Sequence, residues 1–265
     1  MKLDDKVVVV SGAGSGMGRA LCLQLKEKKA RLAMLDLHAE TLQETLKLMG
    51  SYAEFCSIHV VDISQKSEVD LLPTAILQAH GQIDVVINNA GIIQPFVPVN
   101  ELNMQQIERV MNVNFYGTLY MCKAFIPYLL QRPEAHIANV ASMGAFIPFP
   151  GQSIYGASKA AVKLLTEGLF AELMNTKVGI TLIMPGAVNT HITENSGLGT
   201  PKAAKTGEGP KMLEAAEAAQ IMLKGIEQKK LHVLVGKDAS MLNKLYRLSP
   251  LFAIKTIVKK MSGMM

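Results

Sequence analysis

The chain has 265 residues, 49% of them hydrophobic, and a formal net charge of +5. This length and apolar content allow one α/β domain with a large buried core. The excess positive charge follows Gly236, where six basic residues accompany one acid, so the remainder of the chain is balanced. The sequence has no tryptophan and no basic patch interleaved with aromatic residues, which argues against nucleic acid as a partner.

No apolar run is long enough to span a bilayer, and the first predicted strand follows the N-terminus without a signal peptide. We therefore expect a cytoplasmic protein. Cys22, Cys56 and Cys122 form no CxxC pair and lie in apolar elements, as expected for buried thiols in a reducing compartment. The six histidines show no metal-ligand spacing, and we predict no metal.

Apolar, β-branched runs alternate with helical patterns along the chain. This alternation predicts an α/β fold, with a doubly wound parallel sheet of about seven strands and helices on both faces. No linker or repeat divides residues 1–265, so we expect a single domain. The predicted strands are 7–10, 31–35, 55–61, 83–87, 137–141, 179–184 and 231–235, and the predicted helices are 19–29, 39–49, 65–80, 103–130, 154–176 and 214–228.

A glycine-rich turn, Ser11-Gly-Ala-Gly-Ser-Gly-Met-Gly18, joins the first strand to the first helix. Glycines in this context let the backbone approach a pyrophosphate at a helix N-terminus. The turn therefore predicts a dinucleotide site. The predicted contacts are Gly12, Ser15, Gly16, Met17 and Gly18.

Asp36 ends the second strand, 18 residues past Gly18. An acid at this distance suits the hydroxyls of an adenosine ribose, and its charge would repel a 2′-phosphate. Asp36 thus favours NAD over NADP, although it could instead cap the next helix.

Tyr155 and Lys159 stand four residues apart at the start of a predicted helix, which places them on one face. A lysine ammonium one turn from a phenol favours the phenolate, so we expect Lys159 to lower the pKa of Tyr155. Such a pair can exchange a proton with an alcohol or a carbonyl.

Together these motifs resemble the short-chain dehydrogenase/reductase family, from about residue 6 to 190. Further matches are Asn88-Asn-Ala-Gly91, Asn114 within Asn112-Val-Asn-Phe-Tyr-Gly, Ser142, and Pro185-Gly-Ala-Val-Asn-Thr190. The resemblance implies a Rossmann fold and an oxidoreductase that acts on CH–OH groups with a nicotinamide cofactor.

The resemblance also implies a role for each matching residue. Tyr155 would exchange the proton, Lys159 would hold the ribose of the nicotinamide, Ser142 would bond the substrate oxygen, and Asn114 would hold a water for proton exchange. The remaining implied cofactor contacts are Asp62 and Ile63 at the adenine, Asn89, Ala90 and Gly91, Pro185 and Gly186, and Val188 and Thr190 at the carboxamide. Three structural alternatives remain: Asn114 ties elements together, Ser142 caps a strand end, or Asp62 caps a helix.

The variable parts of the chain, residues 143–152 and 191–212, would choose the substrate. The first segment is apolar from Phe146 to Pro150. The second is rich in Gly, Pro and Thr, which suits a lid that closes over the substrate. An apolar edge of the substrate site could be added by Ile93, Pro95, Phe96 and Val97. We predict substrate contacts at Met143, Phe149, Gln152 and Ile192, and an apolar secondary alcohol or ketone of steroid, retinoid or lipid type. Alternatively, these side chains pack only against each other.

The last segment, 238–265, is basic and amphipathic, with a helix that breaks or restarts at Ser249-Pro250. It could contact an anionic membrane, cover the substrate mouth or a partner subunit, or pack on its own core.

Two other functions are alternatives to an NAD-dependent dehydrogenase. Asp36 opposes an NADPH-dependent 3-oxoacyl reductase, and the intact Ser142, Tyr155 and Lys159 oppose a non-catalytic sensor or scaffold. By resemblance we expect a homodimer or homotetramer, formed through the helices at 103–130 and 154–176. Val162, Leu165, Leu169 and Leu173 offer an apolar face there, or belong to the core.

Overall fold

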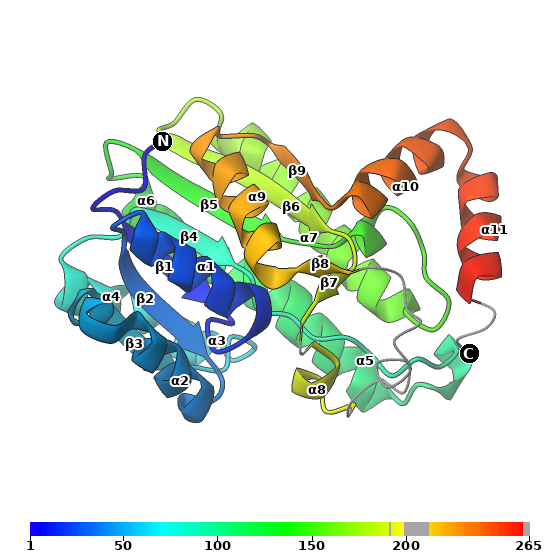
Figure 1. Ribbon diagram of the computed structural model, residues 1–265, viewed down its shortest axis with the longest axis horizontal. Helices are drawn as coiled ribbons and strands as arrows, with labels where there is room; N and C mark the ends of the chain where they lie inside the picture. Colours follow the sequence, from blue (N-terminus) through cyan, green and yellow to red (C-terminus); the bar gives the residue numbers. More distant parts are fainter. Residues whose placement is uncertain (191, 199–211, 262–265) are drawn as a thin grey trace.

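The computed structural model describes residues 1–190, 192–198 and 212–261. The expected lid at 191–212 lies mostly outside these residues. Seven parallel strands form one sheet in the order β3-β2-β1-β4-β5-β6-β9 (Figure 1). The strands are β1 Val7–Ser11, β2 Arg31–Asp36, β3 Cys56–Val60, β4 Val85–Asn88, β5 Ala135–Val140, β6 Val178–Pro185 and β9 His232–Val235. The predicted fold class is confirmed.

Helices cover both faces of the sheet because alternate residues of each strand face opposite ways. Val8 and Val10 of β1 belong to a core with α1, α2 and α9, whereas Val7 and Val9 belong to a core with α4, α6 and α7. These helices are α1 Gly16–Glu27, α2 Ala39–Met49, α4 Leu72–His80, α6 Thr118–Leu129, α7 Ser153–Leu173 and α9 Ala215–Glu227.

The helix predicted at 103–130 is not continuous. α5 Met104–Met111 and α6 are joined by a π-helical turn, Asn112–Gly117. Such turns recur at functional sites, and this one contains the fully buried Asn114. The helix predicted at 65–80 is also divided, into α3 Lys66–Val69 and α4.

Short elements that the sequence did not predict follow β6. β7 Val188–Asn189 pairs in parallel with β8 Leu213–Glu214, and α8 Ile192–Asn195 follows β7. They extend the chain beyond the carboxyl end of the sheet, where the site lies.

The C-terminal segment folds as two helices, α10 Lys237–Leu248 and α11 Pro250–Met261, which confirms the predicted restart at Ser249-Pro250. They lie at one end of the molecule, on the side opposite β3 (Figure 1). Leu242, Ala253 and Ile257 bury Ile147 in a separate apolar cluster. The tail therefore packs against the segment predicted to contact substrate, and Ile147 belongs to this packing.

The three thiols follow the expectation in part. Cys22 and Cys122 are buried, and burial raises the pKa of the Cys122 thiol to about 12, whereas Cys56 is only partly buried. Among the described residues, no helix has the length and apolar character needed to cross a bilayer.

Candidate active site

Two adjoining cavities open at the carboxyl ends of the strands, where ligands bind in doubly wound folds. The first has a volume of about 340 Å³ and the second of about 280 Å³. Met17, Thr190 and Ile192 line both. A ligand in the first cavity would therefore reach the second.

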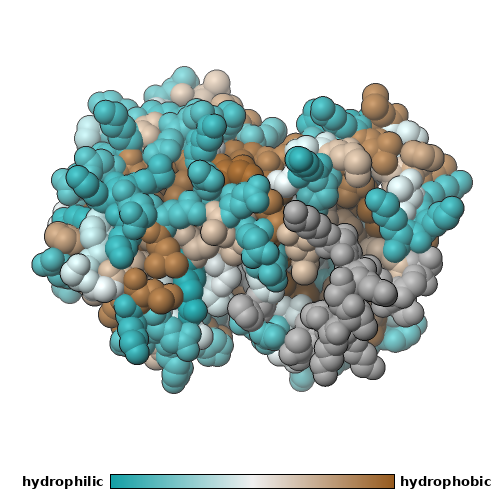
Figure 2. All heavy atoms as spheres, in the orientation of Figure 1, coloured by the Kyte–Doolittle hydropathy of each residue, from teal (hydrophilic) through white to brown (hydrophobic). Residues whose placement is uncertain are grey.

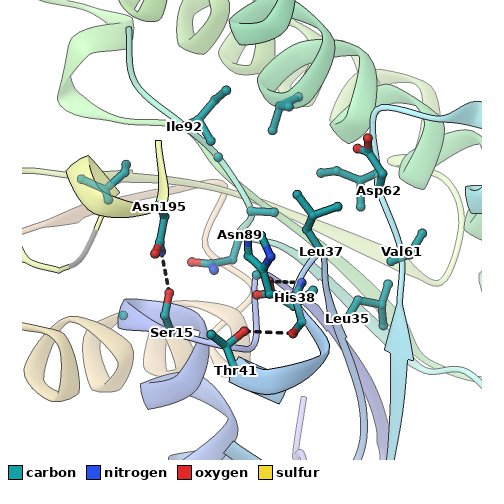
Figure 3. Close-up of a pocket in the computed structure, with 18 of the residues that line it drawn as sticks. Ser15, Leu35, Leu37, His38, Thr41, Val61, Asp62, Asn89, Ile92 and Asn195 are labelled. Atoms are coloured by element: carbon teal, nitrogen blue, oxygen red, sulfur yellow. Dashed lines mark hydrogen bonds between the residues drawn. The ribbon is translucent and has the colours of Figure 1, made fainter. Parts of the chain in front are cut away.

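The first cavity contains most of the residues predicted to hold the dinucleotide. Its lining includes Gly12, Ser15, Gly16 and Met17, Asp36, Asp62 and Ile63, Asn89, Ala90 and Gly91, and Thr190. Figure 3 shows three of them, Ser15, Asp62 and Asn89, around the cavity. Gly18 does not line the cavity, but a Cβ there would collide with the Gly12 carbonyl oxygen, so it permits the close packing of the turn.

The glycine turn fits a phosphate. Gly12 and Gly16 have φ of +69° and +49°, conformations that side chains rarely adopt. The cap residue of α1, Ser15, makes no side-chain hydrogen bond to the helix, and the first turn carries no acid. The N–H groups there therefore remain suited to an anion.

Asp36 faces this turn. Its carboxylate accepts the Gly14 N–H at 2.9 Å and the His38 N–H at 3.2 Å. His38, rather than Asp36, is the cap residue of α2, so the helix-cap alternative fails. Asp62 does not cap α3 either, since Gln65 precedes that helix and Asp62 accepts the Ser64 N–H.

Two asparagines also line the first cavity: Asn195, which the sequence did not single out, and Asn89, a predicted cofactor contact. Asn195 of α8 donates to the Ser15 hydroxyl at 2.7 Å and so joins α8 to the glycine turn (Figure 3). Asn89 contributes a buried Oδ1 that has no hydrogen-bond partner among the described residues. An acceptor without a partner at this place fits a ligand with donor groups, as a nucleotide has.

The second cavity gathers the predicted reaction groups. Ser142 and Tyr155 line it, as do Met143, Phe149, Gln152 and Ile192, the four predicted substrate contacts, and Pro185, Gly186 and Val188. Of the predicted apolar edge, Ile93 and Phe96 line this cavity. Met261 at the end of α11 also lines it, a contact that the sequence could not locate.

Lys159 and Asn114 lie behind the cavities. Lys159 is 3% exposed and donates from Nζ to the Val140 carbonyl at 3.0 Å. Asn114 donates to the Ile92 carbonyl and to the Ser158 hydroxyl, both at 2.9 Å, so it does tie the segment after β4 to α7. A Cβ on Gly91 would lie 2.9 Å from Lys159 Nζ, which places the amine directly behind that glycine.

The electrostatics of Tyr155 differ from the prediction. Burial raises the pKa of Tyr155, and a hydrogen bond with Ser142 opposes the increase. Lys159 does not contribute to the Tyr155 shift, and burial lowers the pKa of Lys159 itself to about 8. Ser142 also accepts the Gly144 N–H at 3.0 Å, so the predicted cap interaction and the contact with Tyr155 coexist.

Gln94 positions the helix that carries Tyr155. Its Oε1 accepts the N–H groups of Ile154 and Tyr155 at 2.8 and 3.0 Å, and its Nε2 donates to the Gly151 carbonyl. Helices usually receive such bonds from a residue next to the first turn. Here the cap comes from 60 residues earlier in the chain, so no local pattern could have revealed it.

Comparisons with known proteins agree with this geometry. Residues 6–200 match the family model for short chain dehydrogenases. The putative oxidoreductase SadH of Mycobacterium tuberculosis is 32% identical over 252 residues, which cover 92% of this chain and 91% of SadH. An uncharacterized oxidoreductase of Staphylococcus epidermidis is 35% identical over 201 residues, covering 76% of this chain and 86% of that protein.

Solved structures show the same fold. A short-chain dehydrogenase/reductase of Burkholderia phymatum in complex with NAD has a TM-score of 0.85 at 27% identity, covering 95% of this chain and 96% of that one. A short chain dehydrogenase of Burkholderia cenocepacia in complex with NADP has a TM-score of 0.81 at 25% identity, covering 97% and 99%. The chain belongs to the short-chain dehydrogenase/reductase family and is an oxidoreductase that uses a nicotinamide cofactor.

Proposed function

We propose that this oxidoreductase interconverts an apolar secondary alcohol and its ketone, with NAD as the preferred cofactor. The observation that carries the proposal is the second cavity. It places Ser142 and Tyr155 among apolar side chains such as Met143, Phe149 and Ile93, beside the cavity suited to the dinucleotide. A steroid, retinoid or other lipid-like alcohol suits such a lining better than a sugar or a small acid.

Asp36 supports the preference for NAD. The carboxylate lies in the first cavity, and a 2′-phosphate near it would meet a like charge. The two solved relatives carry NAD in one case and NADP in the other, so the family alone does not decide between the cofactors.

The side chains support a proton transfer at the substrate oxygen. Bound nicotinamide supplies the donor or acceptor of the hydride. In reduction, the Tyr155 hydroxyl, held neutral by its raised pKa, donates its proton to the carbonyl oxygen. Ser142 stabilises the developing charge on that oxygen with a hydrogen bond. In oxidation the proton moves in the reverse direction, from the alcohol to Tyr155.

The alternatives have less support. Asp36 opposes an NADPH-dependent 3-oxoacyl reductase, and a sensor or scaffold would not need Ser142 and Tyr155 in one cavity.

The test is the absorbance of the reduced nicotinamide, followed with NAD⁺ and NADP⁺ in parallel over secondary alcohols that include steroids, retinoids and long-chain alcohols. We expect turnover with NAD⁺ and a loss of about 10²-fold or more in Tyr155→Phe. Equal turnover in Tyr155→Phe would remove the proposed proton path, and a preference for NADP⁺ would overturn the role of Asp36.

We also propose a homo-oligomer that uses the outer face of α7. Val162, Leu169 and Leu173 are buried in the core, so the face suggested by the sequence is an internal one. Leu164, Phe170 and Met174 instead remain exposed, by 71%, 38% and 64%. Analytical ultracentrifugation of the wild type and Leu164→Glu tests this, and an unchanged sedimentation coefficient would exclude this face.

A further inference from the structure

Gln152 has a hydrogen-bond acceptor that the protein does not use. The residue is 5% exposed, immediately precedes α7, and lines the second cavity beside Ser142 and Tyr155. Its Oε1 is buried and has no hydrogen-bond partner among the described residues. A buried acceptor without a hydrogen-bond partner costs free energy. Because Gln152 lines a cavity, this acceptor points to a ligand that supplies the missing hydrogen-bond donor.

The orientation of this amide is determined by its neighbour. Gln152 Nε2 donates to the Gln94 carbonyl at 2.8 Å. Turning the amide over would place Oε1 against that carbonyl, two acceptors facing each other. Because Gln94 is itself held by Gly151, Ile154 and Tyr155, the acceptor of Gln152 is fixed relative to Tyr155.

The spacing indicates where the missing donor belongs. Gln152 stands three residues before Tyr155 and lines the same cavity, so a group that reaches Gln152 lies near the carbon that reacts at Tyr155. Most of the other side chains around the cavity, such as Met143 and Phe149, are apolar, and Thr190 and Thr193 add hydroxyl groups. A substrate that matches the cavity is therefore largely apolar, with a polar group that faces Gln152 near the group that reacts at Tyr155.

We propose that the substrate carries a second hydroxyl on a carbon one or two positions from the reacting carbon, and that this hydroxyl donates to Gln152 Oε1. The substrate class is then an apolar 1,2- or 1,3-diol, or the corresponding hydroxyketone. The inference rests on the proposed function. The second hydroxyl is not consumed: the reacting carbon loses a hydride to NAD⁺, its hydroxyl proton passes to Tyr155 and on to solvent, and the diol becomes a hydroxyketone.

Matched alcohols test the proposal. The pairs are 2-octanol with 1,2-octanediol, and 3-octanol with 1,3-octanediol, each with NAD⁺. We expect one diol to exceed its partner in kcat/KM by about tenfold or more, because the monohydric alcohol leaves Oε1 without a donor. In Gln152→Met, which has a similar shape and no acceptor, the ratio should fall to about one.

Controls separate specificity from damage to the fold. NADH binding uses the other cavity and verifies folding, with Gln152→Leu as a second variant if Gln152→Met does not fold. Gln94→Met keeps the carbonyl that orients the Gln152 amide but removes the bonds to Gly151, Ile154 and Tyr155, so it should lower kcat for both alcohols. Turnover that depends on Tyr155 without any diol preference would overturn this inference and leave the proposed function intact. If no alcohol in the wider panel were oxidised, the proposed function would itself fail, and the inference with it.

The α10–α11 pair supports an independent proposal about a partner. We define the tail face as Met241, Leu248, Leu251, Phe252 and Val258, five apolar side chains that are 44–85% exposed. Figure 2 shows brown apolar side chains beside teal polar ones at this end of the molecule. Exposed basic side chains of the same helices are Lys237, Lys244, Arg247, Lys255, Lys259 and Lys260, and no acidic residue follows Asp238.

The geometry of the tail face points to a membrane surface that contains anionic lipid. Apolar side chains at the bend between the helices can enter the lipid interface, and the surrounding lysines and arginine meet the headgroups. Met261 of α11 lines the second cavity, so the same segment would place the mouth of the apolar cavity near the bilayer.

Vesicle flotation tests this proposal. We expect the wild type to float with vesicles of phosphatidylcholine and phosphatidylserine and not with phosphatidylcholine alone. The double variant Leu251→Glu, Phe252→Glu should not float, whereas Leu164→Glu on α7, which is also an exposed apolar position, should float as the wild type does. Failure of the wild type to float would overturn the proposal, as would a change of oligomeric state in the double variant, since a second copy would then cover the tail face.

Discussion

Asp36 is the residue whose charge should select the cofactor. Its two carboxylate oxygens accept backbone N–H groups of the chain itself, one from Gly14 and one from His38, and the side chain lies in the first cavity. Asp36→Asn removes the charge and one of these two acceptors. We expect kcat/KM for NAD⁺ to fall by roughly tenfold to a hundredfold and that for NADP⁺ to rise, because a weaker ribose bond costs about 1–3 kcal/mol and the repulsion of a 2′-phosphate is lost.

Steady-state kinetics with both cofactors measures this change. If Asp36→Asn still rejected NADP⁺, the shape of the cavity rather than the charge would select the cofactor.

The burial of the Lys159 amine leads to a prediction about stability. Its pKa falls from 10.5 to about 8 on folding because the amine is buried. The folded protein therefore binds fewer protons than the unfolded chain between pH 8 and 10.5, and the contribution of Lys159 to stability increases with pH across this window. Below pH 8 the full cost of burying the charge applies, roughly 3 kcal/mol.

Lys159→Met should therefore be inactive and yet more stable at pH 7, by about 1–2 kcal/mol once the lost bond to the Val140 carbonyl is subtracted. Urea unfolding from pH 7 to 10 measures the difference in unfolding free energy between Lys159→Met and the wild type. This difference should shrink as the pH rises. Because other groups titrate equally in both proteins, a constant difference would show that the Lys159 pKa is not lowered.

At the scale of one helix, the start of α7 depends on Gln94. Gln94→Ala removes the acceptor shared by the Ile154 and Tyr155 N–H groups. We expect a loss of about 1–3 kcal/mol in unfolding free energy, and a fall in kcat as the first turn that carries Tyr155 loosens.

Gln106→Ala is the matched control, because it removes one of the two hydrogen bonds of the exposed capping box at α5. We expect Gln106→Ala to lower the unfolding free energy by about 1 kcal/mol or less and to leave kcat unchanged. Equal kcat in Gln94→Ala and the wild type, measured with saturating substrates, would show that Gln94 supports folding without positioning Tyr155.

The elements themselves could be predicted from sequence to very different degrees. The strands were predicted correctly because short apolar, β-branched runs are typical of parallel strands that are buried on both faces. The break between α3 and α4 was missed although Pro73 marks it, since proline is accommodated in the first turn of a helix but disrupts its interior. The π-helical turn at Asn112–Gly117 was missed for a deeper reason: one additional residue in a turn hardly changes the apolar period.

The whole molecule shows why the site was only partly predictable. Motifs that are local in the sequence, such as the glycine turn and Tyr155, line the cavities at the carboxyl edge of the sheet. The predicted direction of the Tyr155 pKa was wrong because it depends on how deeply Tyr155 itself is buried, which spacing does not reveal. The tail could not be placed either, because its contact with Ile147 joins segments that lie far apart in the sequence.

The position of the tail leads to a prediction that distinguishes the two cavities. Met261 of α11 lines the second cavity and not the first, and α11 covers Ile147 through Ala253 and Ile257. Deleting residues 250–265 should therefore raise the KM for an apolar alcohol by several-fold to about tenfold, through lost apolar contact, and leave the KM for NAD⁺ unchanged. Met261→Gln should produce the smaller part of this effect without uncovering Ile147. If both Michaelis constants rose together, α11 would support the fold as a whole, and if neither changed, the mouth of the second cavity would be formed without the tail.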